Sequence, residues 1–358
     1  MSSTASVETQ VASETVAKRV WSGTRRFRPV LVLLIVLYIY MAVTQTGFFT
    51  TSNMENLATS VSVLWVASLG MTFVVLSGGF DLSIGAVGAL AAYFMGKVLE
   101  AGMPPGAAIA LGIVSGGLVG AAINGMLIGV LRLSFFVVTL ASMTALTGVV
   151  NLWSNTQTIT LTSPTIVNIG VGHFVGIPIA VWIMVGTLVL LLFLQHRSYF
   201  GRDVLAVGGN FDAARLSGIR TERTILAVYA ISGALAALGG IIIAARIGGA
   251  SPEVDNNLPL QAAAAVLIGG TTLTGGAGGL GGTAIGVMFI GVLQNGLSIA
   301  GVQSFWQQVI TGVILVSAVL FDTLQSRNRQ RWSRRFGRGA HKLGKSPKIL
   351  TPDQEGPS

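Results

Sequence analysis

The sequence predicts an all-α polytopic membrane protein, with about ten transmembrane helices and several broken segments. Of its 358 residues, 52% are hydrophobic and only 10% are charged, and the mean hydropathy is +0.74. A soluble protein carries about a quarter charged residues. Between Val30 and Phe321 there are only eight lysines and arginines, and five of them lie in one loop, 197–223. Long uncharged stretches of this kind are typical of helices that span a bilayer.

The chain divides into three predicted regions. Residues 1–28 form a tail rich in Ser, Thr and Ala, of which we expect 1–24 to be disordered. Residues 29–322 form the transmembrane domain, and 323–358 form a basic tail. The apolar run that begins at Pro29 lacks a good small-x-small cleavage site, so we expect an uncleaved first helix over 29–44 and not a signal peptide.

Nine further apolar runs complete the predicted set of ten. The run at 260–274 is short, which leaves open a re-entrant segment in place of a full span. The nine runs are 57–76, 83–99, 106–131, 134–153, 179–196, 224–244, 260–274, 277–299 and 305–321.

Basic residues orient this set. They cluster before the first predicted helix, after the fourth (Arg132), after the sixth (the 197–223 loop) and after the tenth. With ten helices all of these fall on one side, which the positive-inside bias makes cytoplasmic, together with both termini. Lys97 and Arg246 then lie near the other side.

The formal charge of +9 is concentrated in the two flanks, with five basic residues before Pro29 and nine after Asp322. This distribution favours contact with anionic membrane lipid over binding of nucleic acid. The chain has no cysteine, which excludes disulfides, thiol catalysis and cysteine-ligated metals.

Two sequence echoes suggest internal duplication. The segments 77–85 and 268–276 share the pattern GG-x-x-L-[ST]-x-G, and Asn124-Gly followed by Ser-Phe resembles Asn295-Gly followed by Ser-Phe. The spacing between the echoes differs, at 46 against 26 residues, so recurrence through a glycine-rich composition is the alternative. Broken segments at corresponding places in two halves are where transporters put the substrate pathway.

No motif indicates catalysis or nucleotide binding by this chain. Residues 339–346 fit the G-x-x-x-x-G-K-[ST] pattern, but no apolar strand precedes them and Pro347 follows at once. Residues 276–281 fit G-x-G-x-x-G inside a membrane segment, where close helix packing explains the glycines. The three histidines are scattered. We therefore expect no enzyme activity, no cofactor and no metal site.

Asp81 is the one acid in the broken segment SGGFDLSIG. A carboxylate this close to hydrocarbon is costly and indicates a function. The favoured interpretation is local, with Asp81 or Ser83 capping the helix that starts there. A direct contact of Asp81 with substrate or ion is the alternative.

The 197–223 loop contains a short predicted helix at 211–217. Gly218 then takes the C′ position, where a residue with left-handed backbone conformation commonly ends a helix. A solvated connector is the simpler interpretation. At 27 residues the loop is long for that, and long ordered loops are usually functional. We predict a docking element.

At this point the sequence resembles a known family. The pattern Asp212-Ala-Ala-x-x-x-Gly resembles the E-A-A-x-x-x-G loop of ABC importer permeases, with Asp in place of Glu. Several further segments resemble the ribose/xylose-type sugar permeases of the branched-chain-amino-acid/ribose superfamily, and the likeness covers roughly 30–322. At Gln261 the family more often has a charged or small residue. The matching segments are 77–85, 200–219, 244–252, 264–276, 294–296 and 305–307.

The resemblance implies a permease domain at 29–322 in the bacterial inner membrane, with a fold similar to that of the cobalamin importers. Cytoplasmic ATPase subunits would bind the ATP, a periplasmic sugar-binding protein would deliver substrate, and a second permease copy or paralogue would complete the pore. The ATPase would dock on the 197–223 loop, through Asp212, Ala213, Ala214, Arg215 and Gly218.

For the translocation pathway we predict the polar residues of the broken segments, namely Asp81, Ser83, Asn124, Asn295 and Trp306. Two other functions compete with the importer: an ion-driven transporter with Asp81 as its coupling acid, and a passive channel. Pentoses, hexoses, deoxy sugars, polyols and furanosyl signalling compounds all stay open as substrates.

Overall fold

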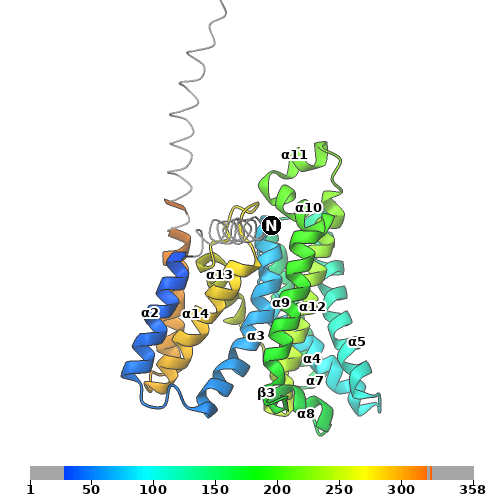
Figure 1. Ribbon diagram of the computed structural model, residues 1–358. Coiled ribbons are helices and arrows are strands. Elements are labelled where there is room, and N and C mark those ends of the chain that lie inside the picture. The colour runs from blue at the N-terminus through cyan, green and yellow to red at the C-terminus, as the bar shows by residue number, and fades with distance from the viewer. Residues whose placement is uncertain (1–27, 321–322, 325–358) are drawn as a thin grey trace, which may run out of the picture.

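The computed structural model describes residues 28–320 and 323–324, and these residues form a bundle of helices that run along one common direction (Figure 1). The predicted disordered tail and nearly all of the basic tail lie outside the described residues. The helices are α2 (Arg28–Thr44), α3 (Thr51–Leu76), α4 (Ile84–Glu100), α5 (Pro105–Val119), a π-helical turn (Gly120–Gly125), α6 (Met126–Gly129), α7 (Phe135–Ser154), α8 (Pro164–Val171), α9 (Ile179–Arg197), α10 (Tyr199–Gly209), α11 (Phe211–Leu216), α12 (Thr221–Ile247), α13 (Leu258–Ile268), α14 (Leu280–Ile299) and a last helix, Ser304–Leu320.

Within the described residues, six helical stretches are long and apolar enough to cross a membrane, as expected of a polytopic membrane protein. They are Thr51–Leu76, Pro105–Gly129, Phe135–Ser154, Ile179–Arg197, Thr221–Ile247 and Leu280–Ile299. Each of the ten predicted apolar runs overlaps a helix, but ten spanning helices stay a prediction. The described strands are two-residue pieces: β1 (Ile159–Thr160) pairs antiparallel with β4 (Gly249–Ala250), and β2 (His173–Phe174) with β3 (Ile177–Pro178).

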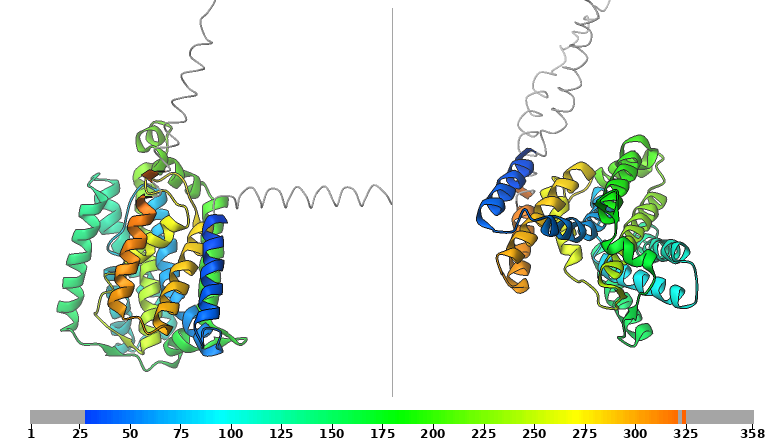
Figure 2. Two further views of the ribbon diagram at one scale, coloured as in Figure 1. Left: turned by 90° about the vertical axis from the view of Figure 1, so that its left-hand side faces the viewer. Right: turned by 60° about the horizontal axis from the view of Figure 1, so that its bottom comes forward.

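The core is built around α3 and α12. Every residue of α3 from Val61 to Leu76 is buried, so this helix is apolar all round and enclosed by others. In contrast, α9 exposes large apolar side chains such as Val189 and Phe193, as a lipid-facing helix does. Figure 2 shows α2 and the last helix at one edge of the bundle and α5 at the opposite edge.

Glycines let α12 approach α4 and α5 closely. A Cβ atom at Gly240 would collide with the backbone carbonyl of Gly88, and one at Gly233 would collide with that of Gly116. Contacts through small residues are a usual basis of helix association in membranes. Backbone atoms cannot move aside as the end of a side chain can, so these glycines fix the spacing of the helices.

We expect Gly240→Ala to destabilise the bundle and lower the yield of folded protein. Thermal unfolding in detergent measures the effect, which we expect at about 1–3 kcal/mol as for other overpacked sites. The control is Gly186→Ala in α9, where an added Cβ meets nothing within 4 Å and the helix gains propensity. If both variants unfold at the same temperature, the contact between Gly88 and Gly240 does not hold α4 against α12.

The broken segment after α12 contains a half-length helix. At eleven residues, α13 is about 16 Å long, whereas the hydrocarbon core is about 30 Å thick. Between β4 and α13 the chain is non-helical over 251–255 and forms a turn at 256–257. This length favours the re-entrant alternative for 260–274.

The two echo motifs fold into the same kind of turn. After α3, Gly78 and Gly79 donate N–H groups to Val75 and Val74, and after α13, Gly270 and Thr271 bond Leu267 and Val266 in the same pattern. Both Gly78 and Gly270 have positive φ, at 83° and 84°. Gly78 therefore corresponds to Gly270 and not to Gly269, so the sequence echo is displaced by one residue. The turns also touch, since Gly276 N–H donates to Leu76 O at 2.9 Å.

Candidate functional site

Five buried polar side chains gather where the turn after α3 meets α4, α7, α12 and the π-helical turn. Each exposes 4% or less of its surface. We call this group the polar cluster: Asp81, Ser83, Asn124, Ser142 and Ser232. It joins three of the five predicted pathway residues and adds two serines that the sequence did not indicate.

The Asp81 carboxylate is held by neutral donors. Its Oδ1 accepts from the Ser83 N–H at 2.9 Å and the Ser83 hydroxyl at 2.6 Å, and its Oδ2 accepts from the Ser232 hydroxyl at 2.9 Å. Asp81 thus binds the N–H of Ser83, the residue that precedes α4, and not a free N–H of the helix itself, so the predicted capping by Asp81 is wrong. Ser83 takes the N-cap position, but its own side chain makes no cap bond.

Asn124 links this carboxylate to α7. Its Nδ2 donates to the Ser83 hydroxyl at 2.8 Å and lies 3.5 Å from Oδ1 of Asp81, while its Oδ1 accepts from the Ser142 hydroxyl at 2.6 Å. Asn124 lies in the π-helical turn, a distortion that often occurs at functional sites. The cluster therefore fixes one turn and three helical stretches relative to one another.

Asn295 and Trp306 lie away from the polar cluster. Asn295 exchanges two hydrogen bonds with Asn53 at the start of α3, at 2.9 and 3.1 Å. It lines a cavity of about 410 Å³ between α3, α12, α13 and α14. Trp306 is 61% exposed on the last helix. The five predicted pathway residues therefore lie in three separate places: the polar cluster, the cavity that Asn295 lines, and the exposed surface of the last helix.

The predicted docking helix is present as α11, one residue shorter than expected. The Asn210 side chain caps its start by accepting from Ala213 N–H at 2.9 Å. At its end, Gly218 has φ +85° and donates to Arg215 O, while Ile219 N–H donates to Ala214 O. These two bonds form a Schellman motif, so Gly218 has the predicted role in the backbone.

The side chains of α11 point two ways. Ala214 is buried, whereas Asp212, Ala213 and Arg215 are exposed, and Leu216 is 89% exposed. Figure 1 shows α11 standing beyond the ends of the long helices. An exposed leucine beside charged groups is suited to contact with another protein, although the sequence pattern did not single out Leu216.

Phe211 anchors α11 to the bundle. The Arg132 guanidinium lies 5.0 Å from the centre of its ring, in a cation–π contact. Both residues line a cavity of about 370 Å³ with Gly78, Gly79 and Tyr229. The Tyr229 hydroxyl donates to Phe80 O at 3.4 Å, next to Asp81. Phe211 and Tyr229 thus border one cavity that lies between α11 and the turn that carries Asp81. Among residues 28–320 and 323–324, no group of three acidic or histidine side chains could hold a metal.

Comparison with known proteins gives a consistent set of relatives. Residues 53–319 match the family described as branched-chain amino acid transport system / permease component. The chain is 39% identical to the ribose import permease of Bacillus subtilis, over 82% of this chain and 91% of that one. It is 33% identical to an L-arabinose ABC transporter permease of Azospirillum brasilense (87% and 91%) and 35% to a D-allose permease of Escherichia coli (83% and 91%). No solved structure matches the chain significantly.

Proposed function

Since the chain belongs to the family of branched-chain amino acid transport permeases, we propose that it is the membrane-spanning subunit of an ATP-binding-cassette importer for a monosaccharide or small polyol. The family description names amino acids. The relatives named above carry ribose, L-arabinose and D-allose, and they align over about nine-tenths of their own lengths. This agreement among sugar permeases is the observation that carries the proposal.

The chain's partners follow from this function. A cytoplasmic ATPase binds the ATP, and its contact surface on this chain is the exposed face of α11 with Asp212, Arg215 and Leu216. A periplasmic sugar-binding protein delivers the sugar, and a second permease copy or paralogue completes the pathway. The permease itself has no catalytic site, no cofactor and no metal. It lies in the bacterial inner membrane with both termini cytoplasmic, and its fold is similar to that of the cobalamin importers.

The proposed mechanism runs through the residues that border the cavity between α11 and the turn after α3. Closure of the ATPase dimer on ATP moves α11, and Phe211 and Tyr229 transmit the movement to the turn at Gly78–Asp81. The polar cluster moves with that turn, because its hydrogen bonds tie Asp81 to α12 and to the π-helical turn. In alternating access, such a group of helices switches between two arrangements. Each arrangement opens the pathway to one side of the membrane.

The test is uptake by proteoliposomes that contain the chain with its ATPase, supplied with the binding protein outside and ATP inside. We expect labelled ribose, arabinose or allose to accumulate only when ATP is hydrolysed, and labelled leucine to stay outside. A non-hydrolysable ATP analogue is the control for nucleotide binding alone. Uptake that persists without the ATPase and collapses with an ion gradient would establish the ion-driven alternative instead.

A further inference from the structure

The segment between β4 and α13, residues 251–257, forms a wall inside the bundle, and we call it the wall segment. β4 holds one end through its pairing with β1. The other end lies against the first turn of α4, where a Cβ at Gly85 would come within 2.5 Å of Asp255 O. Gly85 follows Ser83 of the polar cluster by two residues. The wall segment thus reaches from the β1–β4 end of the molecule to the immediate neighbourhood of Asp81.

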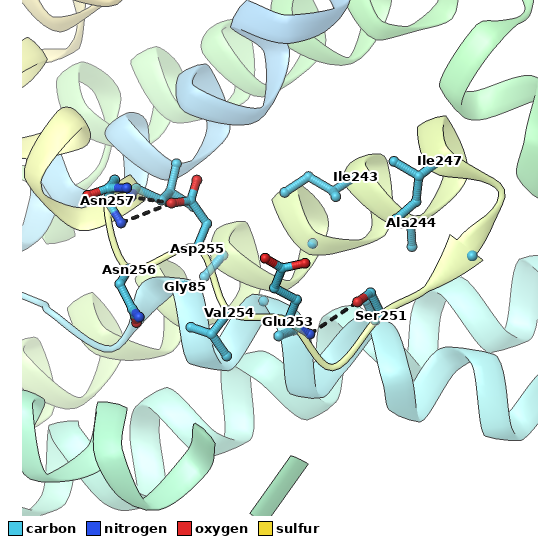
Figure 3. Close-up of a pocket in the computed structure, with 17 residues that line it drawn as sticks. Gly85, Ile243, Ala244, Ile247, Ser251, Glu253, Val254, Asp255, Asn256 and Asn257 are labelled. Atoms are coloured by element: carbon cyan, nitrogen blue, oxygen red, sulfur yellow. Dashed lines mark hydrogen bonds between the residues drawn. The ribbon is translucent and has the colours of Figure 1, made fainter. Parts of the chain in front are cut away.

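Two cavities adjoin the wall segment. The first has a volume of about 490 Å³ and lies between the wall segment, α4 and α12 (Figure 3). Small residues of the two helices, among them Gly88 and Gly240, leave the space open. The second is the cavity of about 410 Å³ that Asn295 lines, and it shares Ile243, Asp255 and Leu258 with the first. Asp255 therefore faces both cavities.

From Glu253 to Asn256, successive side chains of the wall segment point to alternate sides (Figure 3). In Figure 3, Glu253 and Asp255 project to one side, and Val254 and Asn256 project to the other. Oδ1 of Asp255 accepts from the N–H groups of Asn257 and Leu258, at 2.9 and 3.2 Å.

Within the part of the chain that the structure describes, no hydrogen bond or ion pair uses Oδ2 of Asp255 or the Glu253 carboxylate. Both side chains are exposed, so these oxygens are available to a ligand in the first cavity.

The lining of the first cavity suits a hydroxyl-rich ligand that carries no negative charge. Carboxylate oxygens accept hydrogen bonds from hydroxyl groups, and the Asn256 and Asn257 amides both donate and accept. None of the described residues that line the first cavity is cationic, so nothing there compensates the charge of a phosphate or an amino acid carboxylate. The second cavity is lined by amides, including Gln261, Gln294 and Asn295, and also by the cation Arg246. Both volumes lie within the range of about 300–1,000 Å³ that is usual for small-molecule sites.

We propose that the wall segment is the sugar-binding element of the pathway. Glu253 and Asp255 accept hydrogen bonds from the hydroxyl groups of a neutral monosaccharide in the first cavity, and Asp255 remains in contact as the sugar passes to the amides of the second. This inference rests on the function proposed above. It also gives the polar cluster a role, because a sugar beside Gly85 lies next to the turn that carries Asp81 and Ser83.

Uptake kinetics test the contribution of the two carboxylates. In proteoliposomes with the ATPase and the ribose-loaded binding protein, we expect Glu253→Gln and Asp255→Asn each to lower ribose uptake about tenfold or more. Asp255→Asn retains Oδ1 and thus the two backbone bonds. The matched control is Glu100→Gln at the same end of the molecule, which removes an exposed carboxylate paired with Lys97 and should change uptake less than about twofold. Wild-type uptake by both wall-segment variants would overturn the proposal.

Chemical labelling tests occupancy without relying on transport. The chain has no cysteine, so Asn256→Cys introduces a single reactive site. In the full chain assembled with its ATPase, we expect ribose to slow maleimide labelling of Asn256→Cys and to leave Glu100→Cys unaffected. If ribose slows labelling of Asn256→Cys but uptake does not depend on ATP, the importer function is refuted and the proposed sugar site stands. ATP-driven uptake without protection, and with unimpaired wall-segment variants, would refute the site and retain the importer.

Discussion

Replacing Gly218 with proline is expected to abolish ATP-driven sugar uptake and to release the ATPase from the chain. Gly218 has φ +85° and donates its N–H to Arg215 O, whereas proline requires φ near about −65° and has no N–H. The Schellman motif that ends α11 would be lost, and with it the placement of Arg215 and Leu216. Co-purification of the ATPase with the chain and sugar uptake by the same membranes measure the two losses.

The chain offers a control with the same backbone geometry. Gly102, after α4, has φ +86° and donates to Leu99 O, and Met103 N–H donates to Val98 O, so it also ends a helix by a Schellman motif. The connection between α4 and α5, which contains it, lies at the other end of the bundle from α11 (Figure 1). Gly102→Pro introduces the same strain there, and we expect the inserted protein to retain its ATPase. If Gly218→Pro retains the ATPase as well, α11 is not the docking element.

The docking helix was predictable because its signals are local. A glycine after a short amphipathic run favours a left-handed C′ position whatever surrounds it, and the structure places the helix end within one residue of the prediction. The N-cap is a similar local signal, since asparagine, here Asn210, is a preferred residue type at that position.

The polar cluster was predictable only in part, because its remaining members are distant in sequence. Ser232 bonds an aspartate 151 positions earlier, and nothing in the sequence distinguishes it from Ser68, another buried serine in an apolar helix. The sequence echo pairs Asn295 with Asn124, because both precede glycine. In the structure the two asparagines lie in different polar environments. A local sequence repeat does not determine which helices pack against each of them.

The wall segment was missed for a different reason. Apolar runs locate spanning helices, but 251–257 is mostly polar and non-helical, and its sequence is that of an ordinary connection between two runs. Its position inside the bundle depends on Gly85, which lets the Asp255 carbonyl approach α4. That contact joins residues 170 positions apart, and no local pattern predicts it.

Asp81→Leu is expected to prevent assembly of the chain, whereas Asp81→Asn is expected to assemble and transport. Leucine leaves the Ser83 N–H and the hydroxyls of Ser83 and Ser232 without their acceptor in a buried site, at a cost of about 1–3 kcal/mol for each donor that finds no other partner. Asparagine keeps Oδ1 for Ser83, and its Nδ2 can donate to the Ser232 hydroxyl once that hydroxyl turns. The yield of monodisperse protein after detergent extraction measures assembly.

The asparagine variant also separates the importer from the ion-driven transporter, because the two functions use Asp81 differently. In the importer the carboxylate organises the turn before α4, so ATP-driven uptake by Asp81→Asn should stay within about threefold of wild type, as for one altered hydrogen bond. In an ion-driven transporter Asp81 must gain and lose charge, so the asparagine variant would assemble normally and accumulate no sugar. Uptake by well-assembled Asp81→Asn, measured with and without ATP, therefore distinguishes a structural carboxylate from a coupling carboxylate, and failure of such protein to transport would contradict the role assigned to the polar cluster.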